Sequence, residues 1–221
     1  MRSAFLRNAS RESTRSIADN LVIVFARTPI GGQVKTRLGL APSAAARLQE
    51  RLIRSALKIA MESECGPVEL HVTRQHEFFR SLGVRLRLQR GANLGERMLH
   101  ALRGGLRRYS TVILIGSDAP ALRAADLRRA ARWLRAGSDV VLAPAEDGGY
   151  ALIAARRVSP SLFQEIAWGT GSVYRETVGR LERARLRWRA LPVVWDVDRP
   201  QDLQRLRSLR FSSASRQAAR R

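Results

Sequence analysis

Three short polar segments, each following an apolar run, carry the residues of this chain that could do chemistry. They are residues 31–37, 116–120 and 144–150. The first segment is basic and the other two are acidic. Guanidinium and ammonium groups suit phosphate oxygens, and carboxylates suit a divalent metal ion. If the three segments meet in the folded chain, they could hold a metal–nucleotide complex.

The basic segment combines two glycines with Lys35 and Arg37, and Lys35 is one of only two lysines in the chain. Glycine lets backbone N–H groups approach an anion closely, and the cations balance its charge. The segment is therefore a candidate phosphate loop, with an ordinary exposed turn as the alternative. It has neither the G-x-x-x-x-G-K-[ST] nor the G-x-G-x-x-G spacing, which disfavours a Walker-type ATPase and a dinucleotide-binding enzyme.

Four carboxylates are candidates for metal binding or acid–base chemistry. Asp118 stands in Gly-Ser-Asp-Ala-Pro, Glu146 and Asp147 precede a Gly-Gly pair, and Asp198 stands in Asp-Val-Asp. Each has a structural alternative, because aspartate caps turns and helices and Asp-Gly favours a tight turn. Two adjacent acids before two glycines, at the end of a buried strand, favour a functional role.

Strand and helix patterns alternate along the chain, which predicts an α/β domain with a mostly parallel central sheet. Wholly apolar runs, typical of strands buried on both faces, predict the central strands at residues 21–26, 111–116, 139–143 and 150–154. Further extended segments are expected at 68–72, 84–88 and 188–194. Residues 144–149 are too few for a crossover helix, so the strands on either side should form a hairpin or sharp bend and make the sheet mixed.

Helical spacing of apolar residues, together with caps and breakers, places the helices between these strands. They are expected at residues 43–64, 77–82, 93–109, 124–136, 172–184 and 200–209, with 93–109 loosened at Gly104 and Gly105. Ligands of such sheets bind beyond the carboxyl ends of the strands. The three polar segments follow those ends, so they should converge on one edge of the sheet.

The chain has 221 residues and a net charge of +21, which by itself would suggest a nucleic-acid partner. The excess charge is arginine spread over predicted helices and both termini, and no aromatic RNA-binding strand is present. A solvated arginine-rich surface explains this pattern better than a nucleic-acid footprint or a patch for an anionic surface. We therefore expect no specific nucleic-acid partner.

The single cysteine, Cys65, excludes an intramolecular disulfide and fits a reducing compartment, so we expect a cytoplasmic protein. The three histidines lack metal-ligand spacing, and no apolar run is long enough to span a membrane. Residues 1–18 are interpreted as a flexible extension, 19–211 as a single domain and 212–221 as a flexible arginine-rich tail. The sequence does not indicate an oligomeric state.

Taken in order, the motifs resemble the bacterial DUF2064 family. The motifs are Phe-Ala-Arg at 25–27, Val-Lys-Thr-Arg-Leu at 34–38, Gly-Glu-Arg-Met at 95–98, Leu-Ile-Gly-Ser-Asp at 114–118, Pro-Ala-Glu-Asp-Gly-Gly-Tyr at 144–150, Trp-Gly-Thr at 168–170 and Asp-Val-Asp at 196–198. The resemblance implies a nucleotide-diphospho-sugar transferase fold of the GT-A type, which is a three-layer α/β/α sandwich. The family is similar to arsenosugar-type glycosyltransferases and to molybdenum-cofactor guanylyltransferases.

The resemblance also implies roles for individual residues. A nucleotide and phosphate site is implied at Arg27, Gly32, Lys35, Arg37 and Ser117. A site for Mg²⁺ or Mn²⁺ is implied at Asp118 and Asp198, catalytic carboxylates at Glu146 and Asp147, and an acceptor or sugar side at Gly148, Gly149, Trp168 and Thr170. One departure is that typical glycosyltransferases of this fold carry Asp-x-Asp, whereas the segment 116–120 supplies one aspartate.

The prediction from the sequence is a metal-dependent transferase that takes a nucleotide or nucleotide-sugar donor and a small-molecule acceptor. Glycosyl transfer is the first hypothesis. Nucleotidyl transfer from an NTP to a phosphorylated acceptor, with pyrophosphate release, is the alternative. A nucleotide- or nucleic-acid-binding module without catalysis is the third.

Overall fold

The structure, a computed structural model, describes the backbone of residues 19–218 and the side chains of residues 19–209. The extension predicted for residues 1–18 lies outside this range. The strands are β1 (Asn20–Ala26), β2 (Val68–Val72), β3 (Arg85–Leu88), β4 (Thr111–Gly116), β5 (Val140–Pro144), β6 (Tyr150–Ala155) and β7 (Trp188–Ala190). The α-helices are α1 (Pro42–Glu62), α2 (Leu94–Leu106), α3 (Ala124–Arg135), α4 (Val173–Arg183) and α5 (Pro200–Ala218). Short 3₁₀ helices span Thr36–Leu38, Glu77–Leu82 and Pro160–Leu162.

The seven strands form one sheet in the order β3-β2-β1-β4-β6-β5-β7. Every pair is parallel except those of β6, which runs antiparallel to both β4 and β5. The predicted hairpin at 144–149 is therefore confirmed, and so is the mixed α/β sheet. The turn is tight because Ala145 N–H donates to the carbonyl of Gly149 at 3.0 Å.

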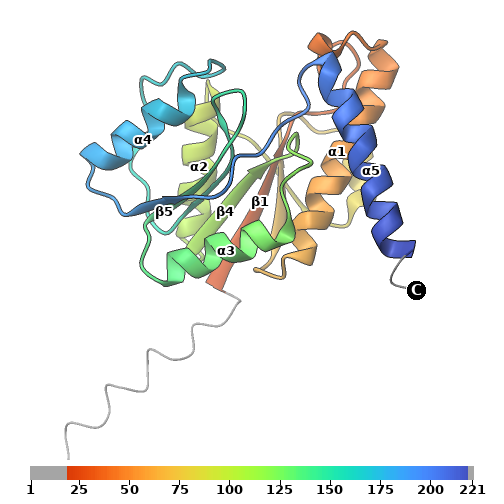
Figure 1. Cartoon of the computed structure of the whole chain (residues 1–221). Helices are drawn as coiled ribbons and strands as arrows, with labels where there is room; N and C mark the ends of the chain where they lie inside the picture. The colour runs from red at the N-terminus through yellow and green to blue at the C-terminus, as the bar shows by residue number, and fades with distance from the viewer. Residues whose placement is uncertain (1–18, 219–221) are drawn as a thin grey trace, which may run out of the picture.

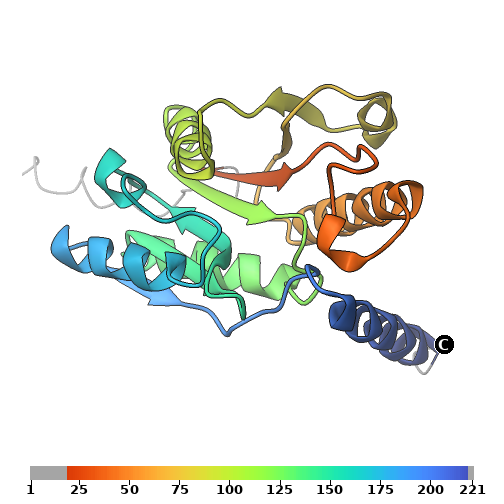
Figure 2. The ribbon, with the colours of Figure 1, turned by 90° about the horizontal axis from the view of Figure 1, so that it is seen from above.

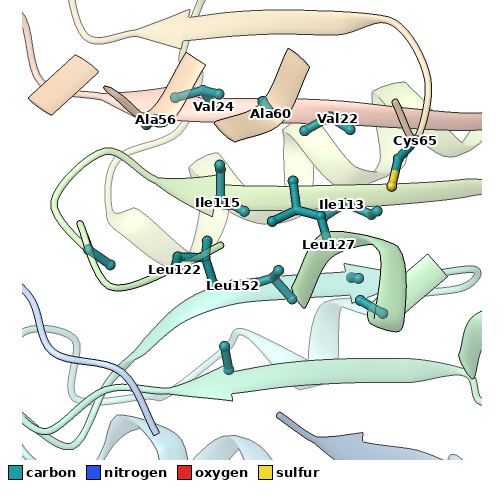
Figure 3. Close-up of a cluster of buried hydrophobic side chains, with 14 of the residues drawn as sticks. Val22, Val24, Ala56, Ala60, Cys65, Ile113, Ile115, Leu122, Leu127 and Leu152 are labelled. Atoms are coloured by element: carbon teal, nitrogen blue, oxygen red, sulfur yellow. The ribbon is translucent and has the colours of Figure 1, made fainter. Parts of the chain in front are cut away.

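Helices cover both faces of the sheet, which gives the three layers visible in Figures 1 and 2. On one face α1 and α3 pack on alternate residues of β1, β4 and β6, and Figure 3 shows this cluster, with Val22, Ile113 and Leu127 among the side chains at its centre. On the other face α2 and α4 pack on the intervening residues. Cys65 is 4% exposed and lies inside the first cluster, so it serves as a core residue.

Two predicted helices differ from those observed. The helix at 94–106 is continuous through Gly104 and Gly105. It is not loosened there, because Gly105 lies so close to β4 that an added Cβ would meet the Val112 side chain at 2.5 Å. Helix α5 runs to Ala218, beyond residue 209 and into the predicted tail. The segment 210–218 contains no glycine or proline that would stop the helix.

Helix α5 lies alongside α1 (Figure 1). Leu203 and Leu206 on α5 pack against a small cluster that includes Leu48 and Leu52 of α1 and the buried Val197. This contact fixes the chain just before α5, where Asp196 and Asp198 stand. Among the described helices, none is long and apolar enough to cross a membrane.

A buried carboxylate joins the start of β5 to the residues that follow β6 and precede β7. Asp139 precedes β5, is 0% exposed, and receives Arg156 Nε at 3.0 Å, Arg157 Nε at 2.9 Å and the Arg187 backbone N–H at 2.9 Å. Burial alone would raise the pKa of Asp139, but these donors outweigh it and lower the pKa to about 2.

Replacing the buried carboxylate of Asp139 tests how much its contacts with the arginines stabilise the fold. Asp139→Asn is expected to lower the free energy of unfolding by about 3 kcal/mol at neutral pH, because the arginines lose their partner. The wild-type advantage is full above the pKa of the unfolded carboxyl and is lost as the pH falls toward the folded pKa of about 2. Urea unfolding at a series of pH values measures this difference. A difference that does not change with pH would contradict the account.

Candidate functional site

A cavity of about 510 Å³ lies at the carboxyl ends of β1 and β4. Its wall also includes the β5–β6 turn, the start of α2, the loop at 168–170 and Asp196. This volume is typical of small-molecule sites, and the position beyond the strand ends is the one that the sequence predicts. We call it the strand-end cavity.

The basic and acidic segments meet beside this cavity through a salt bridge. Lys35 Nζ lies 2.8 Å from Asp118 Oδ2 and donates to the Val197 carbonyl at 2.7 Å. The Lys35 side chain is only 5% exposed, whereas that of Asp118 is 40% exposed. Lys35 does not line the cavity, so in the ligand-free chain it acts behind Asp118 and holds that carboxylate in place.

The second oxygen of the Asp118 carboxylate accepts a hydrogen bond from a neighbouring side chain. Ser117 Oγ donates to Asp118 Oδ1 at 3.0 Å, and Gln49 Nε2 donates to Ser117 Oγ at 3.2 Å. Ser117 and Asp118 both line the cavity. The Asp118 carboxylate is therefore fixed in direction by Lys35, Ser117 and Gln49 before any ligand arrives.

Arg37 and Asp198 lie outside the strand-end cavity and pair with each other. Arg37 Nη1 lies 2.9 Å from Asp198 Oδ2, and the Arg37 side chain is 75% exposed. Gly32 also lies outside the cavity, at an exposed turn with φ of 78°. Arg27, in contrast, lines the cavity next to the end of β1.

Asp196 is the residue that the sequence analysis missed. It lines the cavity with Asp118 and Asp147. We call the part of the cavity surface formed by these three carboxylates the acidic wall. Burial, and then the charges of Asp147, Asp118 and Asp198, raise the pKa of Asp196 to about 6. The Asp-Val-Asp motif pointed to this segment but could not distinguish its two acids, because residues two apart in a regular extended strand point to the same side. In the structure Asp196 lines the cavity, whereas Asp198 pairs with Arg37 outside it.

The two acids of the β5–β6 turn point in different directions. Glu146 lies outside the cavity and accepts both Arg205 Nη1 at 2.7 Å and Arg205 Nη2 at 2.9 Å, which lowers its pKa. Asp147 lines the cavity, and its Oδ1 accepts the Gly149 N–H at 2.9 Å. Of the two predicted catalytic acids, only Asp147 faces the cavity.

The two glycines that follow Asp147 in the sequence allow this turn. Gly148 has φ of 86°, and an added Cβ would lie 2.1 Å from the Gly171 carbonyl oxygen. The Gly148 carbonyl also accepts the Tyr174 N–H at the start of α4, at 2.8 Å. Gly148 thus joins the turn to the 168–172 loop without lining the cavity, whereas Gly149 lines it.

Trp168 and Thr170 also line the strand-end cavity. The Trp168 ring stacks on Phe163 at a centroid distance of 6.4 Å and meets Tyr150 edge-on at 6.5 Å. It also closes on α2, because a Cβ on Gly95 would lie 2.5 Å from the indole. The indole is partly a core group, and its remaining surface is available to a ligand in the cavity.

The acidic wall fits a divalent metal ion that arrives with a phosphate ligand. Within residues 19–209, no group of three or more His, Cys, Asp or Glu side chains could enclose a metal. Mg²⁺ is usually bound by one or two carboxylates together with substrate phosphates and water. Asp118 and Asp196 offer such carboxylates, and the raised pKa of Asp196 marks a position where a positive charge would be stabilised.

The comparisons with known proteins identify the family. Residues 56–170 match the model of the family described as "Uncharacterized protein conserved in bacteria (DUF2064)". A crystal structure from Desulfovibrio desulfuricans G20, described as a "putative nucleotide-diphospho-sugar transferase", is 32% identical, covers 82% of this chain and 83% of its own, and superposes with a TM-score of 0.76. The chain belongs to the DUF2064 family.

More distant structures share the fold of this DUF2064 chain. CMP:2-keto-3-deoxy-manno-octonic acid synthetase in complex with CTP is 13% identical, with a TM-score of 0.61 over 89% of this chain and 100% of its own. Rv0371c from Mycobacterium tuberculosis H37Rv, in complex with manganese, is 19% identical, with a TM-score of 0.51 over 86% of this chain and 98% of its own. No curated protein matches the chain.

The charge on Asp196 has a testable effect on stability. Because its folded pKa is raised to about 6, the ionised Asp196 destabilises the ligand-free chain above that pH, and protonation removes the penalty as the pH falls. Asp196→Asn is expected to raise the free energy of unfolding by about 1–2 kcal/mol at pH about 8, after a discount for solvent screening.

Chemical denaturation in the absence of metal and nucleotide measures this effect. The gain from Asp196→Asn is expected to disappear as the pH falls to about 4, where the wild-type carboxyl is protonated in the folded chain. A destabilised Asp196→Asn variant at pH about 8 would show that the carboxylate is needed for the fold, and would contradict the assignment.

Proposed function

We propose that the chain is a divalent-metal-dependent transferase that uses a nucleotide-activated sugar donor and a small-molecule acceptor. The main observation in its favour is that Asp118, Asp147 and Asp196 all line one cavity at the strand ends, which Arg27 also lines. The description of the 32%-identical relative as a nucleotide-diphospho-sugar transferase supports the donor class.

The donor would bind with its diphosphate near Arg27 and Asp118. Arg27 and Arg97 line the strand-end cavity and can donate to phosphate oxygens. Lys35 acts through Asp118 as a positioning residue, because its ammonium group is already held by Asp118 and Val197. Gly32 and Arg37 stay predictions for the phosphate site, and Arg37 would have to leave Asp198 to reach a donor.

The metal ion would be held by Asp118 and Asp196. When bound, Mg²⁺ or Mn²⁺ would neutralise the negative charge that develops on the leaving nucleotide. The manganese in the Rv0371c complex supports the choice of ion for this fold. Asp198 stays a prediction as a ligand, since it would need to exchange its contact with Arg37 for one with the metal.

Asp147 is the proposed general base of the reaction. It lines the cavity and, as a carboxylate, can accept a hydrogen bond and then a proton from an acceptor hydroxyl. Glu146 is a poor base because the Arg205 guanidinium lowers its pKa, and we assign it a positioning role that ties the turn to α5. Trp168, Thr170 and Gly149 would contact the sugar or the acceptor.

Nucleotidyl transfer is the second candidate, and the fold shared with a CTP-bound synthetase favours it. The two reactions differ in their products. A glycosyl transfer releases a nucleoside diphosphate from a nucleotide sugar, whereas a nucleotidyl transfer releases pyrophosphate from an NTP. A binding module without catalysis would release neither. The cytoplasmic location also stays a prediction.

A binding screen with one matched pair of variants tests the donor and metal site. Nucleotide sugars and NTPs are added with Mg²⁺ or Mn²⁺, and a donor that binds the folded chain raises the melting temperature. Asp118→Asn is expected to abolish the metal-dependent part of this shift. Glu62→Gln, at the C-terminal end of α1, removes one exposed carboxylate and is expected to retain the full shift. An unchanged metal-dependent shift in Asp118→Asn would refute the proposed metal site.

The two turn acids are separated by kinetics on the donor and acceptor found in that screen. Asp147→Asn is expected to lower kcat by about 10²–10⁴-fold, the usual contribution of a general base, with donor binding little changed. Glu146→Gln is expected to reduce kcat by less than about tenfold and to lower stability slightly, because one exposed ion pair is lost. Equal losses of kcat in the two variants would contradict the different roles.

A further inference from the structure

A second cavity, of about 530 Å³, lies between the edge strand β3 and α2. We call it the basic cavity. Its wall carries five arginines and two histidines and no aspartate or glutamate. The arginines come from three places in the chain, and they are Arg87, Arg90, Arg97, Arg107 and Arg108. No residue of this wall other than Arg97 enters the function proposed above.

The basic cavity exists because the apolar cluster on the α2 face ends at β1. That cluster includes residues of β1, β4, β5 and β6 but none of β2 or β3. On β2 and β3 the residues of the same face are ionisable, since His71 stacks on Phe25 of that cluster and pairs in register with Arg87. The edge of the sheet therefore presents a charged wall to α2 instead of an apolar one.

One buried carboxylate balances only part of this charge. Glu69 is 3% exposed and receives Arg108 Nη1 at 2.9 Å and Arg87 Nε at 2.8 Å, with Arg85 Nε at 3.8 Å. Within residues 19–209, neither Arg90 nor Arg107 forms a salt bridge. The wall is thus left with unbalanced positive charge.

The buried His71 in the wall of the basic cavity has a lowered pKa. Burial lowers the pKa of His71, and the nearby Arg87 and Arg108 lower it further, against the opposing effect of Glu69. Gly104 keeps the α2 side of the cavity open, because an added Cβ there would meet only Arg107 Nη2, at 3.8 Å. The cavity is therefore both roomy and electropositive.

We propose that the basic cavity is a second ligand site, which binds the phosphate group of a small molecule. Guanidinium groups present paired N–H donors that match phosphate oxygens, and several of them around one concave site favour a dianion. Gln89 and Arg97 line both cavities, so a phosphate here lies beside the strand-end cavity. The phosphate belongs either to an acceptor that reaches into the strand-end cavity or to a separate ion.

The proposal does not depend on the metal and nucleotide site, and its test keeps the two apart. Calorimetric titration with pyrophosphate and with inorganic phosphate, without metal or nucleotide and at fixed ionic strength, is expected to show saturable binding at one site. Asp118→Asn and Arg27→Gln are expected to keep this binding, because both residues line only the strand-end cavity.

The decisive variants remove two arginines that carry no ion pair. Arg90→Gln/Arg107→Gln is expected to weaken phosphate binding by about tenfold or more, because two charged donors are lost. Arg129→Gln/Arg132→Gln, on the exposed side of α3, removes the same charge and is expected to change the affinity by less than about twofold. Folding of both pairs is checked by their melting temperatures.

Three results would overturn the proposal. They are the absence of saturable phosphate binding, equal losses in the two double variants, and binding of duplex DNA that exceeds phosphate binding and depends steeply on salt. If phosphate binds, glycerol phosphate distinguishes the sources. Tighter binding of this monoester than of inorganic phosphate points to a group on an acceptor, and the reverse order points to a free ion.

Discussion

The salt bridge between Lys35 and Asp118 ties together the parts of the chain that form the strand-end cavity. Lys35 follows the β1 loop, Asp118 follows β4, and the Val197 carbonyl, which also accepts Lys35, precedes α5. Because Lys35 is almost fully buried, its charge needs these acceptors, and losing either would leave an unpaired group. The segment that carries Asp196 is thereby held against the ends of the central strands.

This tie also explains why the acidic wall can persist without a ligand. Asp118 is neutralised from behind by Lys35, and Glu146 is held outside the cavity by Arg205. Asp196 carries the remaining repulsion, which its raised pKa reports. Positive charge is concentrated at the β3 edge of the sheet, where Glu69 balances only part of the arginine charge. An arginine-rich chain thus separates an acidic cavity from a basic one.

Much of the fold could be predicted from local patterns. Continuous apolar runs gave the central strands, and the short 144–149 segment gave the antiparallel β6, because both follow from spacing alone. The meeting of Lys35 with Asp118 followed from the rule that parallel strand ends share an edge. The directions of Asp198 and Glu146 could not be predicted, because they depend on Arg37 and Arg205, whose partners lie far away in sequence.

In the proposed function a metal ion and a nucleotide bind together at the carboxyl ends of β1 and β4. A crystal of the chain grown with Mn²⁺ and a nucleoside diphosphate, measured at the manganese absorption edge, would locate both. An anomalous peak is expected between the carboxylates of Asp118 and Asp196, in contact with the diphosphate. A nucleotide bound elsewhere, or a manganese peak away from both carboxylates, would contradict it.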